Sequence, residues 1–441
     1  MQNSQKKKIV ILSYFFPPCN LTASQRAFSW AKLFINFGYY PTIITRNWNL
    51  KITKPQDLHL NCGTEVIHEI YSEYEVYFLP YKSNLRDRLF TKNVTGIKSI
   101  LQKILTFFEL IFQNFFLWVL PFKNIYEFSL KYVSQNKENI HGIIVTANPF
   151  VFFKFGYLIS KKTNVKWIAD YRDDWNTRVN NQWYSGSKIL SCVAKPLEIW
   201  AEKKWLSNSS CFISVSDNYV YKIKKFLNVS DGFTIYNGFI SSDFDIEFTP
   251  KKPKTFVFSY NGTLISIQKI EIFLDAFKIL VKEFENELTL IVNFIGTGFE
   301  IEQEKRILNY TKGFNKNVNV TKRLTRHEAI ALQKSADVLL LVAYGDVKGS
   351  PGTKIFDYIA LEKPVLLCPT DNDVMEKIMK ETGQAIICET SEEMIEIFKP
   401  IISNYINESV IKKNFNAVAM KNYSRMNQTK LLANLCDTYF V

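Results

Sequence analysis

The sequence predicts an α/β protein built from two successive Rossmann-like, doubly wound domains. At 441 residues the chain is too long for a single hydrophobic core. Short β-branched or apolar runs alternate with helix-length segments whose apolar residues recur every three or four positions, as in parallel βαβ sheets. Near residue 240 the alternation gives way to a polar stretch, and it then starts again. A ligand of two such domains is expected in the cleft between them, at the carboxyl ends of the strands.

The first predicted domain covers residues 1–240. Its opening strand in IVILSYFFPP is followed by a helix in ASQRAFSWAKLFINFGY, which Gly38 ends, and by a strand in PTIIT. This strand, helix, strand order is the start of a doubly wound parallel sheet. Further strands of the domain are predicted at 142–147, 165–170, 211–216 and 233–239.

Residues 241–254 are predicted to link the domains, because they are polar, contain two prolines and lack an apolar period. The second predicted domain covers 255–410. Its strands are predicted in TFVFSYNG, LTLIVNFIG, VNVTKRL, VLLLVA, PVLL and AIIC. Its helices are predicted near 270–283, near 300–309, in HEAIALQKSA and in KIFDYIA. The last residues, 411–441, are helical in pattern.

An amphipathic helix is predicted within an insert at residues 85–120 of the first domain. From Gly96 to Leu120 polar residues step by three or four and leave a broad Ile, Leu and Phe face. These polar residues are Lys98, Gln102, Thr106, Glu109 and Gln113. The regular polar stripe argues against a membrane-spanning helix. Basic flanking residues and Trp118 suit a helix lying in an anionic membrane interface. A helix packed on the first domain is the alternative, and the pattern does not separate the two.

The net charge of +13 predicts an anionic partner, such as an acidic membrane surface or a phosphorylated ligand. No nucleic-acid partner is expected, because the basic residues are spread along the chain and form no recognised module. The seven cysteines form no C-x-x-C pair, and the four histidines lack metal-ligand spacing. We therefore expect no disulfide framework and no zinc site, and a reducing cytosolic location. The apolar run near the N-terminus is too short for a signal peptide.

The second domain places small residues or cations after several of its strands. Gly262 and Thr263 follow the first strand, Gly296 follows the second, and Arg323 follows the third. A Gly-Thr-Lys sequence precedes the helix in KIFDYIA. Backbone N–H groups and helix N-termini at such positions receive phosphate groups. One glycine is weak evidence because βα turns need glycine anyway, but four successive instances predict a phosphate-binding face.

Taken together and in this order, the motifs resemble those of glycosyltransferase family 4, whose members have the GT-B fold. The likeness lies in ILSYFFPPCNLTASQRAFSWAKLFINFGY, WIADYRDDW, EKKWLSNSSCFISVSDNYVYKIKKF, TIYNGF, SYNGTL, LQKSADVLLLV and GTKIFDYIALEKPVLL. The resemblance implies transfer of a sugar from a nucleotide-sugar donor to a lipid-linked or polysaccharide acceptor in bacterial surface-polysaccharide synthesis. It implies retention of anomeric configuration, no bound metal or other cofactor, and a return of residues 411–441 to the first domain. With the amphipathic helix, it suggests a cytoplasmic protein held peripherally on the inner face of the plasma membrane.

The resemblance and the chemistry together assign phosphate-binding roles in the second domain. Lys269 and Arg323 would neutralise the pyrophosphate as the sugar departs. Gly352 and Thr353 would supply backbone N–H donors, and Lys354 is a further candidate cation. For Lys269 and Lys354 a solvated surface charge is the alternative.

The ribose and sugar contacts depend more closely on the family pattern. Asp357 stands where the family's second glutamate bonds the donor ribose. The family's first glutamate would fall on Gly349, which has no side chain. The contact to the donor sugar is therefore missing, or comes from Ser350 or from backbone groups.

In the first domain, Arg26 follows an Ala-Ser pair where relatives often carry two glycines, and it is a candidate for the donor phosphate. Asp170, Arg172 and Asp173 end a strand and are predicted to contact the acceptor or the donor sugar, with one carboxylate acting on the acceptor hydroxyl. A structural Arg-Asp pair is the alternative. Many relatives have a histidine near this place and this chain has none, so no general base is assigned.

Two other functions stay open. A nucleotide-sugar 2-epimerase shares the fold and needs no acceptor. A non-catalytic scaffold of a polysaccharide-assembly complex is compatible with the glycine at position 349 and the absent histidine. The TDND sequence, Thr370 to Asp373, resembles a metal-binding Asp-x-Asp, but a loop that caps the next helix is the favoured interpretation.

Overall fold

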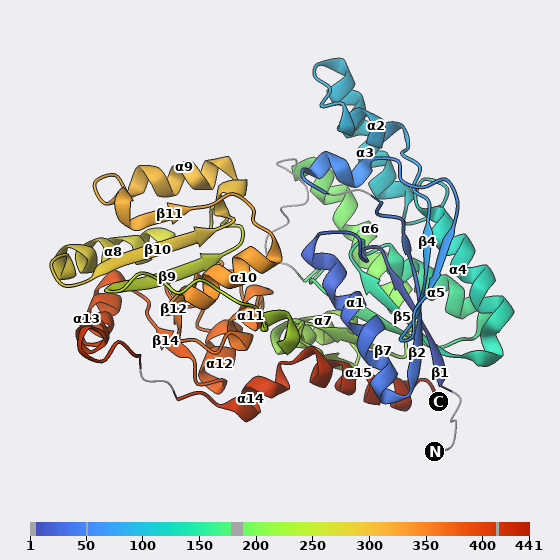
Figure 1. The fold of residues 1–441 in the computed structure, drawn as a ribbon. Helices are drawn as coiled ribbons and strands as arrows, with labels where there is room; N and C mark the ends of the chain where they lie inside the picture. The colour runs from blue at the N-terminus through green and yellow to red at the C-terminus, as the bar shows by residue number, and fades with distance from the viewer. Residues whose placement is uncertain (1–5, 50–51, 178–187, 412–413) are drawn as a thin grey trace. The chain divides into compact units, whose positions relative to one another are not determined.

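The computed structural model describes residues 6–49, 52–177, 188–411 and 414–441. The chain forms two compact units (Figure 1). Unit 1 contains Met1–Tyr236 and Gln428–Val441, and unit 2 contains Asn237–Asn427. Each unit has its own sheet and its own hydrophobic core.

Within its described residues, unit 1 is built on an eight-stranded sheet in the order β3-β4-β2-β1-β5-β6-β7-β8. The strands are β1 (Lys7–Ser13), β2 (Tyr39–Arg46), β3 (Ile67–Ile70), β4 (Glu75–Leu79), β5 (Ile140–Ala147), β6 (Trp167–Tyr171), β7 (Cys211–Ser214) and β8 (Gly232–Thr234). β3 is antiparallel to β4, whereas the other neighbours pair in parallel. The sequence did not predict β3 or β4. The four residues of β3 are exposed, so this strand lacks the apolar alternation that marks a half-buried one.

Helices cover both faces of the unit 1 sheet. Ile9 and Ile11 of β1 pack on one face with α1 and α15, and Val10 and Leu12 pack on the other with α4, α5, α6 and α7. These helices are α1 (Gln25–Leu33), α4 (Lys123–Asn136), α5 (Phe152–Thr163), α6 (Lys188–Leu206), α7 (Asp217–Leu227) and α15 (Arg425–Tyr439). A 3₁₀ turn over Phe34–Phe37 follows α1, and Gly38 ends it in a left-handed conformation, where the sequence predicts the end of the first helix. Because successive β1 residues are fully buried on opposite faces, the strand reads as a continuous apolar run.

In the described part of unit 2, a six-stranded parallel sheet has the order β11-β10-β9-β12-β13-β14. The strands are β9 (Thr255–Asn261), β10 (Thr289–Ile295), β11 (Val318–Val320), β12 (Val338–Leu341), β13 (Val365–Leu367) and β14 (Ala385–Ile387). The helices are α8 (Ile270–Phe284), α9 (Ile301–Tyr310), α10 (Arg326–Ser335), α11 (Lys354–Ala360), α12 (Val374–Glu381), α13 (Ser391–Glu408) and α14 (Ala417–Asn422). Phe256 and Phe258 pack against α8 and α13 on one face. The predicted fold class, with two doubly wound sheets, is confirmed.

The predicted amphipathic helix is shorter than expected. α3 covers Ile97–Phe112, after the short helix α2 (Leu85–Thr91), and the chain turns before residue 120. The amide of Asn114 bonds the carbonyls of Leu110 and Ile111, and Lys154 donates to Gln113 O (2.8 Å). Side chains from the turn and from α5 thus satisfy the carbonyl groups at the end of α3, which a longer helix would satisfy itself.

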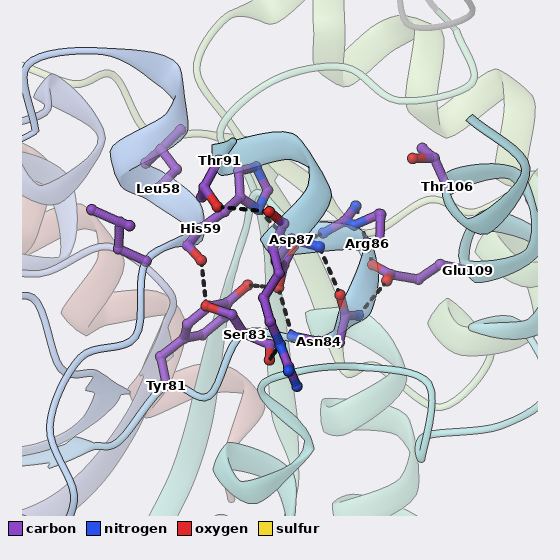
Figure 2. Close-up of polar contacts among 12 residues, drawn as sticks. Leu58, His59, Tyr81, Ser83, Asn84, Arg86, Asp87, Thr91, Thr106 and Glu109 are labelled. Atoms are coloured by element: carbon purple, nitrogen blue, oxygen red, sulfur yellow. Dashed lines mark hydrogen bonds and ion pairs between the residues drawn. The ribbon is translucent and has the colours of Figure 1, made fainter. Parts of the chain in front are cut away.

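A buried polar network around Asp87 contacts α3 through Glu109 (Figure 2). Asp87 of α2 is fully buried and accepts hydrogen bonds from Tyr81 (2.8 Å), His59 (2.9 Å) and Arg86 (2.6 Å). Although burial alone would raise it, these partners lower the pKa of Asp87 to about 2. Arg86 also pairs with Glu109 of α3 (3.3 Å). Because Glu109 of the polar stripe faces this network, the apolar side of α3 is left outward.

The outward side of α3 is apolar and exposed. None of the described residues of α3 is buried, and Ile97 and Phe108 are 84% and 49% exposed. Exposed apolar residues recur at helical spacing, at Ile97, Leu101, Ile104, Phe108 and Phe112. Across the described residues, no helix combines the length and apolarity needed to cross a bilayer.

Candidate functional site

The turns after β9 and β10 adjoin at one edge of the unit 2 sheet. The two strands pair in parallel along their whole length, so their carboxyl ends coincide. The Gly262 N–H donates to Ile295 O (2.8 Å), and Thr297 Oγ1 donates to Gly262 O (3.1 Å). Gly262 has φ +100°, which side-chain-bearing residues rarely adopt. The structure therefore brings the predicted residues Gly262 and Gly296 to the same edge.

Lys354, the first residue of α11, reaches this edge. Its ammonium donates to Tyr260 Oη (2.6 Å) and lies 3.9 Å from the centre of the Tyr260 ring. A Cβ on Gly262 would lie 3.8 Å from Lys354 Nζ, so the glycine turn and the ammonium adjoin. Tyr260 also donates to Thr263 O (3.0 Å). Burial lowers the pKa of Lys354 to about 7, and no carboxylate among the described residues pairs with it.

The loop before α11 is held in a conformation that favours glycine. Gly352 has φ +65°, and a Cβ there would meet Tyr344 Oη at 2.8 Å. The N–H groups of Gly352 and Thr353 donate to no protein group within the described ranges. Ser350 is half-buried, and the Gly349 N–H donates to the Asp373 carboxylate. Backbone donors are therefore available where the sequence predicts them.

Asp357 lies on the first turn of α11 and is paired. Its two carboxylate oxygens accept from Arg326 at 3.2 Å each, and Arg326 also contacts Asp243 at 3.4 Å. The sequence did not single out Arg326. A ribose at Asp357 would share the carboxylate with this guanidinium, so the predicted ribose contact stays a prediction.

The two predicted pyrophosphate cations lie on the surface of unit 2. Lys269 is exposed at the N-cap of α8. Arg323 is exposed after β11, and its guanidinium lies 5.8 Å from the centre of the Phe299 ring. Both side chains are exposed to solvent, so a ligand could reach them from the surface.

The TDND loop caps α12, as the sequence predicts. Asp371 is buried and accepts from the N–H groups of Met375 (2.8 Å) and Glu376 (3.0 Å). These are donors that the first turn of a helix leaves unpaired. No cluster of three or more His, Cys, Asp or Glu side chains in the described part of the chain could hold a metal ion.

In unit 1, Arg26 and Asp170 form a buried ion pair with each other. Arg26 Nη2 lies 2.8 Å from Asp170 Oδ1, and both side chains are almost fully buried. Arg26 also donates to the Ile235 carbonyl (2.8 Å), and Thr146 Oγ1 donates to Asp170 (3.0 Å). The protein thus neutralises both predicted site charges without a ligand.

Arg172 and Asp173 directly follow β6 and are more open. Arg172 donates to Ala23 O (3.3 Å) and to Asp173 (3.3 Å), and it lies over the Phe15 ring. The Asp173 side chain is 40% exposed. The predicted contact with an acceptor or donor sugar therefore rests on these two residues more than on Asp170.

A buried carboxyl group that the sequence did not single out supports the segment after β6. Glu202 of α6 is fully buried and accepts from Tyr171 Oη (2.8 Å) and Asn176 Nδ2 (2.6 Å). Burial raises the pKa of Glu202 to about 7. Its neighbour Ala201 is also buried. A glutamate on the apolar side of a helical pattern was therefore the sequence feature that could have identified Glu202 as a buried carboxyl group.

Replacing Glu202 with glutamine is expected to stabilise unit 1 at pH 8 and to change little at pH 4. The folded carboxyl titrates near 7 and the unfolded one near 4.5, so wild-type stability falls as pH rises between these values. The neutral amide removes that loss, which amounts to about 3 kcal/mol at most. Thermal unfolding across this pH range measures it. The same substitution at exposed Glu138 is the control, and an equal response from both variants would contradict the prediction.

Comparisons with known proteins bear on the fold. No family model matches the sequence, and no curated protein is similar to it in sequence. Sucrose-phosphate synthase (tll1590) from Thermosynechococcus elongatus superposes with a TM-score of 0.62 at 13% identity, covering 99% of each chain. The Anabaena protein Alr3699/HepE in complex with UDP-glucose gives 0.56 at 12% identity, over 98% of this chain and 99% of that one. The lipopolysaccharide outer core galactosyltransferase WaaB gives 0.54 at 12% identity, with the same coverage.

The superpositions extend over both units. The chain has the GT-B fold. The GT-B architecture predicted from the motifs is thereby confirmed. Identities of 12 to 13% carry the fold alone, so membership of glycosyltransferase family 4 and the residue roles taken from it stay predictions.

Proposed function

We propose that this GT-B protein is a glycosyltransferase of the hexosyltransferase type. It moves a sugar from a nucleotide-sugar donor to a lipid-linked or polysaccharide acceptor in cell-surface glycan synthesis. The observation that carries the proposal is the Lys354 ammonium, which lies beside the Gly262 turn without a carboxylate partner in the described part of unit 2. The complex of Alr3699/HepE with UDP-glucose supports a nucleotide sugar as the ligand class.

The chemistry of the proposed transfer explains the composition of the site. As the sugar departs with oxocarbenium character, negative charge develops on the nucleoside diphosphate. Lys354 and the N–H groups of Gly352 and Thr353 would meet that charge, with Arg323 and Lys269 at the surface. We propose that no metal or other cofactor takes part and that the anomeric configuration is retained. Arg172 and Asp173 would contact the acceptor or donor sugar.

A panel of nucleotide sugars tests the proposal. We expect one nucleoside diphosphate to raise the melting temperature of the protein, and the matching donor to be hydrolysed slowly without acceptor. Isomerisation of the donor without release of nucleotide would instead identify a 2-epimerase. Loss of turnover in a folded Asp357→Ala or Arg323→Ala variant would exclude a non-catalytic scaffold, whereas unchanged binding and turnover in both variants would argue for a different site. No stabilisation and no turnover with any donor would overturn the proposal.

We further propose that the protein works in the cytoplasm, bound peripherally to the inner face of the plasma membrane. The exposed apolar side of α3 supports this, because isolated exposed residues are common but a continuous apolar helix face is not. Basic residues flank the helix, and Trp118 beyond its end is 70% exposed. Such a helix binds in the interface of an anionic membrane. All seven cysteines are free thiols, which suits a reducing compartment.

Replacing Phe108 and Phe112 with aspartate is expected to abolish binding to anionic liposomes. Both rings are exposed on the apolar side of α3, so the change should leave the fold intact while placing two charges in the membrane interface. Sedimentation with vesicles measures binding. The matched control replaces Ile279 and Leu308, exposed on helices of unit 2, with aspartate. Unchanged sedimentation of the α3 variant would contradict the membrane contact.

A further inference from the structure

A surface pocket in unit 1 lies beside the end of α3. Its volume is about 650 Å³, and it is lined by α5, α6, Tyr126 of α4 and the turn that follows α3. Lys154, Lys161 and Lys162 come from α5, where spacings of seven and eight residues place them on one side of the helix. Lys204 comes from α6. We call this the lysine pocket.

Aromatic rings, rather than carboxylates, accompany the four lysines. Lys204 Nζ lies 4.4 Å from the centre of the Trp200 ring, and Lys154 Nζ lies 6.0 Å from that of Trp205. Lys161 and Lys162 lie over Tyr157 and Tyr126 at 5.9 and 5.8 Å. No aspartate or glutamate lines the pocket, and no described carboxylate pairs with any of the four ammonium groups. Each of the four ammonium groups is thus paired with a ring within cation–π range and with no carboxylate among the described residues.

Helix ends do not balance this charge. Lys154 donates to the carbonyl at the end of α3, Lys161 and Lys162 lie in the last turn of α5, and Lys204 lies in the last turn of α6. A helix C-terminus carries a partial charge of about −0.5, so three of them supply roughly −1.5 against four full positive charges. Burial and the nearby Lys204 lower the pKa of Lys154 to about 8. An anion in the pocket would relieve this repulsion.

The pocket is continuous with the apolar side of α3. Phe115 lines it and stacks on Trp200, with ring centres 5.7 Å apart. Phe116 also lines it and lies 6.2 Å from Phe112 of α3 and 6.1 Å from Trp118. A ligand that fits both features carries an anionic group next to apolar chains. Tryptophan and tyrosine around such a boundary are typical of membrane interfaces.

We propose that the lysine pocket binds the phosphate group of an anionic phospholipid at a membrane surface, while the acyl chains lie against the exposed apolar side of α3. The inference rests on the membrane contact proposed above and adds a defined headgroup site to it. It requires no change in the proposed transfer chemistry. The pocket lies on unit 1 and shares no residue with the Gly262 and Lys354 group of unit 2.

The test compares vesicles of phosphatidylcholine alone with vesicles that contain one quarter phosphatidylglycerol. The wild-type chain is expected to prefer the anionic vesicles. The triple variant Lys161→Gln, Lys162→Gln, Lys204→Gln is expected to bind them about 100-fold more weakly, because each lysine near an anionic surface contributes roughly a five-fold gain. These three side chains are exposed, so their neutral replacements should not disturb folding.

The matched control is Lys278→Gln, Lys282→Gln, Lys305→Gln on α8 and α9, which lowers the net charge equally at exposed positions of unit 2. Equal losses in the two triple variants would overturn the pocket and indicate a general charge effect. Wild-type binding by the pocket variant would overturn it as well. Complete competition by 10 mM inorganic phosphate without any vesicle preference would show a free-anion site, contrary to the proposal.

Nucleotide-induced thermal stabilisation of the same preparations separates this inference from the proposed function. A pocket variant that loses vesicle preference but keeps its response to nucleotide supports the headgroup site. A wild-type chain that shows vesicle preference but no response to any nucleotide would leave the pocket supported and overturn the transferase proposal. If the wild-type chain shows no vesicle preference, the headgroup site is overturned whatever the nucleotide result.

Discussion

Replacing Asp170 with alanine is expected to lower the free energy of unfolding of unit 1 by about 3–5 kcal/mol, since it leaves the buried Arg26 guanidinium without its counter-charge. Arg26 holds Asp170 through Nε and Nη2 at 2.8 to 3.1 Å, and both residues are shielded from water. Water cannot resolvate the guanidinium without opening the core. For a unit of this size the loss corresponds to a fall in melting temperature of about 10 °C.

The same substitution at Asp173 is the matched control. Asp173 lies three positions further on, is 40% exposed and makes one ion pair, with Arg172 at 3.3 Å. Surface substitutions of this kind change stability by about 0.5 kcal/mol or less. Thermal unfolding of both variants decides the matter. An Asp170→Ala protein with wild-type stability but without sugar transfer would contradict the structural role. It would instead support the predicted contact of Asp170 with the acceptor or the donor sugar.

A second variant, Arg26→Met with Asp170→Leu, separates the charge pair from the packing. Replacing both partners of a buried pair with apolar residues is often close to neutral, whereas removing one is not. Recovery should be partial, because the Ile235 carbonyl also loses the Arg26 donor. A double variant as unstable as Asp170→Ala would assign the loss to packing rather than to the unpaired charge.

Replacing Lys354 with methionine is expected to weaken binding of the donor nucleotide by about 10–100-fold. Methionine keeps most of the apolar stem and removes the ammonium, whose charge-assisted hydrogen bonds to phosphate contribute about 1.5–3 kcal/mol. The free protein should not lose stability, because burial disfavours the charged form and lowers the pKa of Lys354 to about 7. Isothermal titration with the best nucleotide sugar of the panel measures the change.

The affinity for the donor nucleotide is expected to fall as pH rises above 7. Below pH 7 Lys354 is already charged in the free protein, so binding costs no proton uptake. Above pH 7 the bound phosphate must draw a proton onto it, and wild-type affinity should fall by about tenfold per pH unit until the pKa of the bound form is reached. The Lys354→Met variant should show no such fall. The control variant Lys278→Met, at an exposed position, should show the same fall in affinity with pH as the wild type. A Lys354→Met protein whose affinity falls with pH as steeply as that of the wild type would contradict the role of Lys354.

The predicted and observed strands differ at β8 and at β3, for two different reasons. The sequence predicts a strand at 233–239, but β8 ends at Thr234. The carbonyls of Ile235 and Tyr236 accept from Arg26 instead of continuing the ladder. A donor that lies 209 residues away in the chain cannot be read from the local pattern. β3 was missed because its exposed residues carry no apolar period.

The candidate site was predicted unevenly. Gly262, Gly296, Gly352 and Lys354 are identified by their positions after strands or before a helix, and the structure places them accordingly. Arg326, which pairs with Asp357, was missed because an arginine at the start of an exposed helix looks like a solvated charge. Glu202 left only a faint signal, a carboxylate on the apolar side of α6.

Residue spacing alone predicts the two doubly wound domains and the presence of the amphipathic helix, since strand and helix periods are properties of neighbouring residues. Charge pairing is decided only by the tertiary structure. Asp170 faces Arg26 across 144 positions, and Lys354 meets Tyr260 across 94. A charged side chain is either neutralised within the core or remains available to a ligand. Which of the two happens depends on the distant group that folding places within about 3 Å of it, and on how much water remains around it.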